Sequence, residues 1–196
     1  MTKMKTVVAL LLAATAAAAS AHVTLEQATA KADTDYKATF MVPHGCDGSP
    51  TTSITVQVPD DIELANPQAK PGWTLSVKKV ALTAPLSVDG KRASARTSEV
   101  TWSGGQLPAD RYDEFVLFTK LPDHGGIEHF KVIQQCQTGK NEWTQIPAEG
   151  QSAQDLPNPA PGVELFVVKP MNMNMHMGHG DMKDMDGMGN MPEHHH

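Results

Sequence analysis

The sequence predicts an all-β protein, an antiparallel β-sandwich of seven or more strands. Apolar and polar residues alternate in short runs, and Pro and Gly residues separate these runs. No segment shows the periodicity of a convincing amphipathic helix. Every Trp, Tyr, Phe and Cys lies within residues 22–169, and a segment of about 150 residues is enough for one domain with a single core. These observations favour a sandwich fold.

The expected strands follow one another at short intervals. Turn residues such as Pro43-His44-Gly45, Pro59 and Gly104-Gly105 end the alternating runs. Phe115 to Phe118 is continuously apolar, as expected for a strand that is buried on both faces. In chain order the expected strands are 36–42, 54–58, 73–77, 100–102, 115–118, 127–135, 143–146 and 163–168.

Residues 1–21 have the three parts of a secretory signal peptide. Lys3 and Lys5 form a basic start, residues 7–19 are apolar apart from Thr15, and Ala19-Ser20-Ala21 offers small residues to a signal peptidase. The apolar run of about 13 residues is shorter than the roughly 20 that a membrane span needs. We therefore expect cleavage after Ala21, export to the periplasm or the cell exterior, and His22 as the first mature residue.

The acidic net charge of the chain argues against two classes of partner. The formal net charge is −6, and removal of Lys3 and Lys5 makes it −8. This acidity argues against nucleic acid and against an anionic membrane surface as partners, and no later segment is apolar and long enough to span a bilayer.

In an oxidising compartment Cys46 and Cys136 predict one disulfide. It would close a loop of 90 residues, worth roughly 4 kcal/mol in a chain-entropy account.

Residues 170–196 form a tail of a different composition. They hold eight of the 11 methionines and five of the nine histidines, without any aromatic or branched aliphatic residue. Such a segment cannot build a core and should be disordered without a ligand. Thioether and imidazole groups suit copper, Met favouring Cu(I) and His also serving Cu(II). The candidate ligands in its first ten residues are Met171, Met173, Met175, His176, Met177 and His179.

An N-terminal histidine can chelate a metal by itself. Its α-amine and its imidazole Nδ1 belong to one residue and can close a ring on the same ion. Their unperturbed pKa values, about 7.7–8.0 and about 6.5, let Cu(II) displace both protons near neutral pH. Cu(II) also favours nitrogen ligands in a planar arrangement. His22 is therefore a candidate ligand, although most N-terminal residues are merely frayed.

A predicted hairpin brings further candidates together. Residues 137–142 read as a connection with Gly139-Lys140 as a two-residue loop, which would place Cys136 opposite Trp143. If Cys136 bonds Cys46, then His44, Asp47 and Trp143 share one neighbourhood. A slip of one residue would send Trp143 to the other face of the sheet. Trp143 can equally be a core aromatic that packs on the disulfide.

Several segments in this order resemble the YcnI-type domain, over nearly the whole of residues 22–169. The matching segments are His-Val-Thr-Leu at 22–25, Met-Val-Pro-His-Gly-Cys at 41–46, Pro-Thr-Thr at 50–52, Lys-Pro-Gly-Trp at 70–73, Val-Thr-Trp at 100–102, Glu-Phe at 114–115 and Asn-Glu-Trp at 141–143.

The resemblance implies a bacterial extracytoplasmic copper-binding protein with an immunoglobulin-like or fibronectin-like β-sandwich, often encoded beside copper transporters. It also implies a single-histidine brace for Cu(II), in which the terminal His supplies amine and imidazole, a carboxylate supplies oxygen and a Trp indole lies against the metal. His22 and Trp143 match two of these roles. Asp47 is the first choice for the carboxylate, and Glu26 is the second. This chain departs from some family members, which carry a C-terminal membrane anchor and lack the two cysteines.

Three functions are consistent with these features. The first is a non-catalytic copper protein that stores or delivers copper outside the cytoplasm, with a copper transporter or another periplasmic copper protein as partner. The second is a copper-dependent oxidative enzyme, which would need a second imidazole from His44, His124 or His129. The third is an interaction module, since sandwich folds often serve that role. It leaves the Met/His tail unexplained.

Overall fold

The computed structural model describes residues 22–88 and 91–168. The predicted signal peptide, residues 1–21, lies outside the described residues. So does the predicted metal-binding tail at 170–196, with the candidate ligands Met171, Met173, Met175, His176, Met177 and His179.

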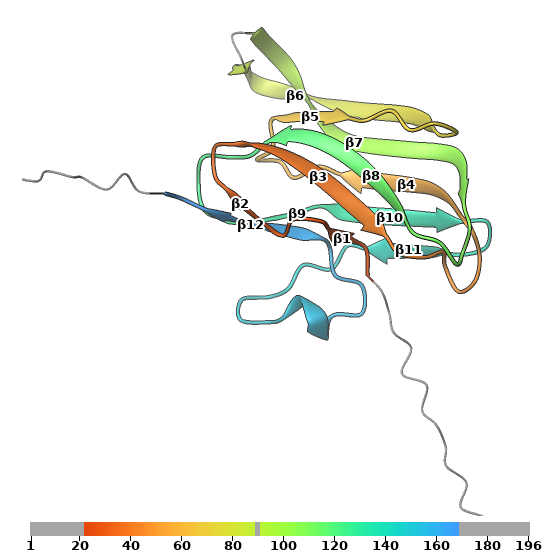
Figure 1. Ribbon diagram of the computed structural model, residues 1–196. Helices are drawn as coiled ribbons and strands as arrows, with labels where there is room; N and C mark the ends of the chain where they lie inside the picture. The colour runs from red at the N-terminus through yellow and green to blue at the C-terminus, as the bar shows by residue number, and fades with distance from the viewer. Residues whose placement is uncertain (1–21, 89–90, 169–196) are drawn as a thin grey trace, which may run out of the picture.

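Two main sheets and one small sheet form the fold (Figure 1). The four-stranded sheet has the order β1 (Thr24–Leu25), β3 (Asp35–Val42), β8 (Asp113–Lys120), β5 (Leu64–Pro67). The five-stranded sheet has the order β11 (Lys140–Trp143), β10 (Lys131–Cys136), β4 (Thr51–Gln57), β7 (Lys91–Leu107), β6 (Thr74–Val88). The small sheet has the order β2 (Thr29–Lys31), β12 (Gly162–Phe166), β9 (Gly126–His129). Among the described residues the helical segment is a single 3₁₀ turn, η1 (Ala153–Asp155).

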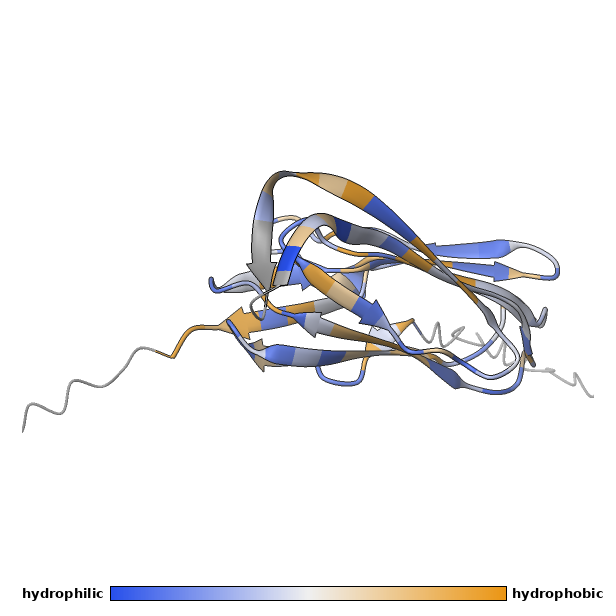
Figure 2. Ribbon diagram, turned by 90° about the horizontal axis from the view of Figure 1, so that it is seen from above, coloured by the Kyte–Doolittle hydropathy of each residue, from blue (hydrophilic) through white to orange (hydrophobic). Residues whose placement is uncertain are grey.

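The all-β prediction is confirmed, with one parallel pair in an otherwise antiparallel fold. β2 and β12 run parallel, while the other paired strands of the described chain are antiparallel. Bands of hydrophobic and hydrophilic residues alternate along the strands in Figure 2, as expected when each strand has one face toward the core.

Aromatic side chains from the two main sheets meet in the core. Phe115 of β8 packs edge-on against Trp102 of β7, with ring centroids 5.5 Å apart. Phe40 of β3 lies 5.3 Å from Phe130, the residue between β9 and β10. All four side chains are almost completely buried. Rings in such edge contacts contribute beyond the area that they bury, so these pairs tie the sheets together.

Three short strands and one strand break were not predicted. β1, β2 and β5 have two to four residues each, too few for an alternating pattern to stand out. The expected strand at 127–135 is two strands, because Phe130 is buried and its N–H bonds to Pro161 O at 2.8 Å. The chain thereby passes from the small sheet to the five-stranded sheet. β6 and β7 are much longer than expected. The first half of β7 is rich in polar residues, and the far end of β6 is apolar but exposed, with Val80 at 41%, so neither shows the alternation of a half-buried strand.

The predicted register of the β10–β11 hairpin is wrong. Trp143 pairs with Val132, and Gln135 pairs with Lys140, so the loop has four residues, 136–139. Residues 137 and 138 bond instead to the neighbouring segment: Gln137 N–H donates to Pro50 O and Thr138 N–H to Ser49 Oγ. The partner of Trp143 moves from Cys136 to Val132, an even number of residues away, so Trp143 keeps the predicted face. β11 also ends at Trp143, three residues before the expected end.

Candidate metal centre

His22 lies directly beside Trp143. His22 precedes β1, whose Thr24 pairs with Met41 near the end of β3. Trp143 is the last residue of β11. The two ring centroids are 5.5 Å apart, and the ring planes are inclined by 60°. His22 is half-buried, whereas Trp143 is 2% exposed and belongs to the core. The structure therefore brings together two residues that are 121 positions apart in the sequence.

Gln134 fixes the orientation of the Trp143 ring. Its side chain is 1% exposed, and its Oε1 accepts a hydrogen bond from Trp143 Nε1 at 3.2 Å. Its Nε2 donates to His44 O at 2.6 Å and to Thr51 Oγ1 at 2.8 Å. A buried amide with its hydrogen-bonding capacity in use holds its partners in one arrangement. Gln134 thus connects the indole beside His22 with the backbone of the His44 segment.

Sequence reasoning missed Gln134, although a signal was present. Along β10, Val132, Gln134 and Cys136 face inward and are buried. A glutamine between two apolar inward positions must find partners inside the protein. Such a polar residue in a core position is worth treating as part of a site.

The disulfide between Cys46 and Cys136 is present, with Cα atoms 6.0 Å apart. Cys46 begins a tight turn, in which its N–H donates to Ser49 O and Ser49 N–H donates back to Cys46 O at 2.7 Å. Asp47 and Gly48 occupy the tip with φ angles of 46° and 82°. Positive φ at both central residues is the geometry of a type I′ turn, which Asp-Gly favours. Asp47 is therefore presented to solvent from a rigid, cross-linked loop.

His44 is half-buried and has a defined tautomer. Its Nδ1 lies 2.5 Å from Gly45 O, and a carbonyl oxygen can only accept, so Nδ1 carries the proton. The neutral ring then has its lone pair on Nε2, the atom that a metal would use.

The carboxylate candidates differ in how closely they could approach His22. Glu26 is exposed and follows β1, where its N–H bonds to Thr39 O. Four residues of extended backbone span roughly 13 Å, which is farther than a chelating Glu side chain reaches. Asp47 lies on a separate loop, so no fixed backbone spacing from His22 restricts its approach. Both remain predictions, and the spacing argument favours Asp47.

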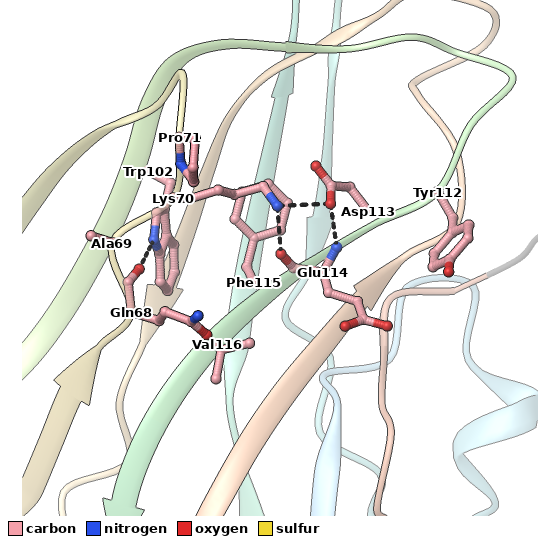
Figure 3. Close-up of a pocket in the computed structure, with 10 residues that line it drawn as sticks. All are labelled: Gln68, Ala69, Lys70, Pro71, Trp102, Tyr112, Asp113, Glu114, Phe115 and Val116. Atoms are coloured by element: carbon pink, nitrogen blue, oxygen red, sulfur yellow. Dashed lines mark hydrogen bonds and ion pairs between the residues drawn. The ribbon is translucent and has the colours of Figure 1, made fainter.

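Another surface hollow lies elsewhere and is lined by residues 68–71, Trp102 and residues 112–116 (Figure 3). Lys70 Nζ contacts Asp113 Oδ1 at 2.7 Å and Glu114 O at 3.0 Å, and lies over the Phe115 ring. Trp102 Nε1 donates to Gln68 O at 2.9 Å. These polar groups bond to one another and thereby join β8 to the segment that precedes β6.

The described residues include no helix that is long and apolar enough to cross a membrane.

Comparison with known proteins gives a curated relative, the copper-binding protein CutI of Bacillus subtilis (strain 168). It is 29% identical over 131 residues, which cover 65% of this chain and 57% of the relative. The match thus spans somewhat more than half of the relative's length.

A solved structure supports the fold. An uncharacterised protein from Nocardia farcinica with an immunoglobulin-like fold superposes with a TM-score of 0.55 and 26% sequence identity. The match covers 74% of this chain and 97% of that chain. The immunoglobulin-like sandwich that the resemblance implied is confirmed. A family model described as a domain of unknown function, DUF1775, matches residues 22–165. The chain therefore belongs to the DUF1775 family, the family of the YcnI-type copper-binding proteins that its sequence resembles.

Proposed function

We propose that this protein is exported, is cleaved after Ala21, and then binds one Cu(II) ion in a single-histidine brace at His22. Its role would be to hold or deliver copper outside the cytoplasm. The observation that carries the proposal is the contact between His22 and Trp143, with ring centroids 5.5 Å apart. The name of the CutI relative adds that a related protein binds copper.

The chemistry requires a new amine at His22. In the uncleaved chain the His22 nitrogen is an amide, which is a poor metal ligand. Cleavage would convert it to an amine that shares a chelate ring with the imidazole of the same residue. Cu(II) favours such nitrogen ligands. Signal cleavage would therefore create the site.

Trp143 would act on the bound ion through its ring. Its Nε1–H is engaged by Gln134, so the indole cannot turn to offer another group. An ion held by His22 would lie beside a ring system that attracts cations and excludes water from that side. The carboxylate of Asp47 would complete the coordination, with Glu26 as the less suitable choice.

The tail would supply a second kind of copper ligand. Its methionines suit Cu(I), and His176 and His179 can serve either oxidation state. We propose that the tail holds additional copper or passes it to a copper transporter or another periplasmic copper protein.

Binding is a better proposal than oxidative catalysis. An oxygen-activating copper site on this scaffold would need a second imidazole in the metal plane, and the ring beside His22 is an indole. An indole over the ion would also hinder the approach of oxygen.

The test compares mature protein that begins at His22 with a matched protein that retains Ala21. Electron paramagnetic resonance should show one nitrogen-rich Cu(II) site in the first and a much weaker site in the second. Binding should also quench Trp143 fluorescence, because the other two tryptophans pack against Phe115 in the core. Trp143→Phe should remove that quenching. Equal affinity and equal spectra for the two proteins would show that the brace does not form.

A further inference from the structure

The structure contains a second cluster of ligand atoms, formed by Asp61, His124 and Glu128. One ligand atom of each residue lies within 4.8 Å of the others, and among the described residues this is the one such group of three. Asp61 follows β4, His124 lies between β8 and β9, and Glu128 is on β9. Three separate segments thus converge on one point of the surface.

Glu128 is the unusual member of this cluster. It is 7% exposed, although its side chain is a carboxylate. Within residues 22–88 and 91–168 no hydrogen-bond donor reaches that carboxylate. Burial, together with the nearby Asp61, raises the pKa of Glu128 from its ordinary value, while His124 opposes the rise. Burial and the neighbouring Asp61 both disfavour the charged form of Glu128, so a positive charge bound at this position would be favourable.

Two cations that line the adjoining surface hollows are engaged with other carboxylates. Arg96 pairs with Asp60, and Lys78 pairs with Glu99 at 2.5 Å. Asp61 faces His124, whose Nε2 lies 4.0 Å from Asp61 Oδ2. That distance is too long for a hydrogen bond. Two carboxylates therefore face one imidazole with space between them.

The orientation of His124 suits metal binding. Its Nδ1 lies 3.3 Å from Gly125 O, which can only accept, so the neutral ring places its lone pair on Nε2. Nε2 is the atom that faces Asp61. A metal-binding histidine usually donates its other ring N–H to a carbonyl or carboxylate in this way.

The backbone around the cluster is held in place, while two of the ligands can move. Glu128 is fixed because β9 pairs with β12, where Glu128 lies opposite Val163. Asp61 sits in a turn closed by a hydrogen bond from Ile62 N–H to Pro59 O at 3.2 Å. The Asp61 and His124 side chains are exposed. Ligand atoms of a tetrahedral site lie roughly 3.3 Å apart, so the cluster must close by up to about 1.5 Å, which rotation of these two side chains can supply.

We propose that Asp61, His124 and Glu128 form a second metal site, which binds a divalent transition ion of the Zn²⁺ or Cu²⁺ class. One imidazole and two carboxylates form a ligand set of the kind that such ions accept, with a fourth position left for water. Ca²⁺ and Mg²⁺ would require more oxygen ligands. A divalent ion would neutralise the two carboxylates and thereby offset the cost of burying Glu128.

This site is independent of His22. His124 follows the end of β8, where Lys120 pairs with Asp35 at the start of β3. His22 precedes Thr24, which pairs with Met41 near the end of β3. The two sites therefore lie near opposite ends of β3, and the six residue steps from Asp35 to Met41 span roughly 20 Å. Failure of one assignment leaves the other unaffected.

The experiment measures Zn²⁺ bound to the full mature chain, in a His22→Ala background that removes the first site. His124→Ala and Glu128→Gln should each bind one equivalent less than the background protein. Asp123→Asn, which removes a charge beside His124 without touching the cluster, should bind the same amount as the background. Zn²⁺ should also raise the Tm of the background protein more than that of either ligand variant.

Glu128→Gln has a second expected effect that a structural role would not produce. With the metal removed by a chelator, its Tm should equal or exceed that of the background protein, because a neutral amide costs less to bury than a carboxylate. If this variant does not fold, His124→Ala, at an exposed position, still decides the stoichiometry. Unchanged Zn²⁺ binding in His124→Ala, or an equal loss in Asp123→Asn, would overturn the proposal.

Discussion

Replacement of Gln134 by methionine should destabilise the fold strongly, although the change preserves side-chain length and nearly preserves volume. The Gln134 amide accepts from Trp143 Nε1 and, at 3.5 Å, from Asn141 Nδ2, and it donates to His44 O and Thr51 Oγ1. These interactions disappear in Gln134→Met, and the long bond from Asn141 contributes least. Each lost hydrogen bond costs about 1 kcal/mol, and more where the remaining partner stays buried without water. We expect the free energy of unfolding to fall by about 3–4 kcal/mol.

The assay is urea unfolding followed by tryptophan fluorescence, with the slope of the transition checked for constancy. Gln135→Met is the matched control, because the neighbouring side chain is exposed and water can replace its bonds to Cys136 O and Gly139 O. The control should lose less than about 1 kcal/mol, since exposed hydrogen bonds contribute little.

Copper affinity provides a second readout. If Gln134 orients the indole beside His22, the folded Gln134→Met protein should bind Cu(II) more weakly than the Gln135→Met protein. A loss of stability no larger than that of the control would refute the role of Gln134 as the hydrogen-bonding centre. Unchanged copper affinity would refute its role in positioning Trp143.

Three other perturbations test separate features. Replacement of Cys46 and Cys136 by serine should lower the free energy of unfolding by about 4 kcal/mol, because the bond closes a loop with a sequence separation of 90; a reductant should bring the parent protein close to the variant in thermal melts. Tyr36 is buried, and burial raises its pKa to about 12, with Glu26 adding to the rise. Its contribution is intact below the unfolded pKa of about 10 and is lost as pH rises toward 12, by at most about 3 kcal/mol. Denaturation curves of Tyr36→Phe should therefore show a shallower alkaline decline, and an identical decline would contradict this assignment. Asp47→Asn keeps a residue that tolerates positive φ, so stability should change by less than about 0.5 kcal/mol. Its Cu(II) affinity should fall if Asp47 is the ligand, and a fall in Glu26→Gln alone would instead identify Glu26.

The fold class followed from local patterns, and its details did not. Alternation identified β3 and β4, because each has one face in the core and the other outside. A continuous apolar run identified β8, but the expectation that this strand is buried on both faces was wrong: Phe115 and Leu117 are buried, whereas Phe118 is 46% exposed. β1, β2 and β5 were missed because strands of two to four residues have no measurable period. The parallel pairing of β2 with β12 joins segments that are far apart in the chain. No local pattern could have indicated it.

The candidate site, too, could be predicted from the sequence only in part. The sequence alone proposed His22, through the predicted cleavage position, and Trp143, through its place in the family resemblance. It also paired Cys46 with Cys136, which the structure contains. These features depend on residue type, position and spacing, which a sequence displays directly.

Only the tertiary structure decided what surrounds these residues. The register of β10 with β11 is set by bonds from residues 137 and 138 to the Ser49–Pro50 segment, so the hairpin taken alone predicts it wrongly. That register places Gln134 between Trp143 and His44. The convergence of Asp61, His124 and Glu128 likewise depends on how three segments pack. Contacts between distant segments are chosen by the energy of the whole core, and a residue's own neighbours in sequence carry little information about them.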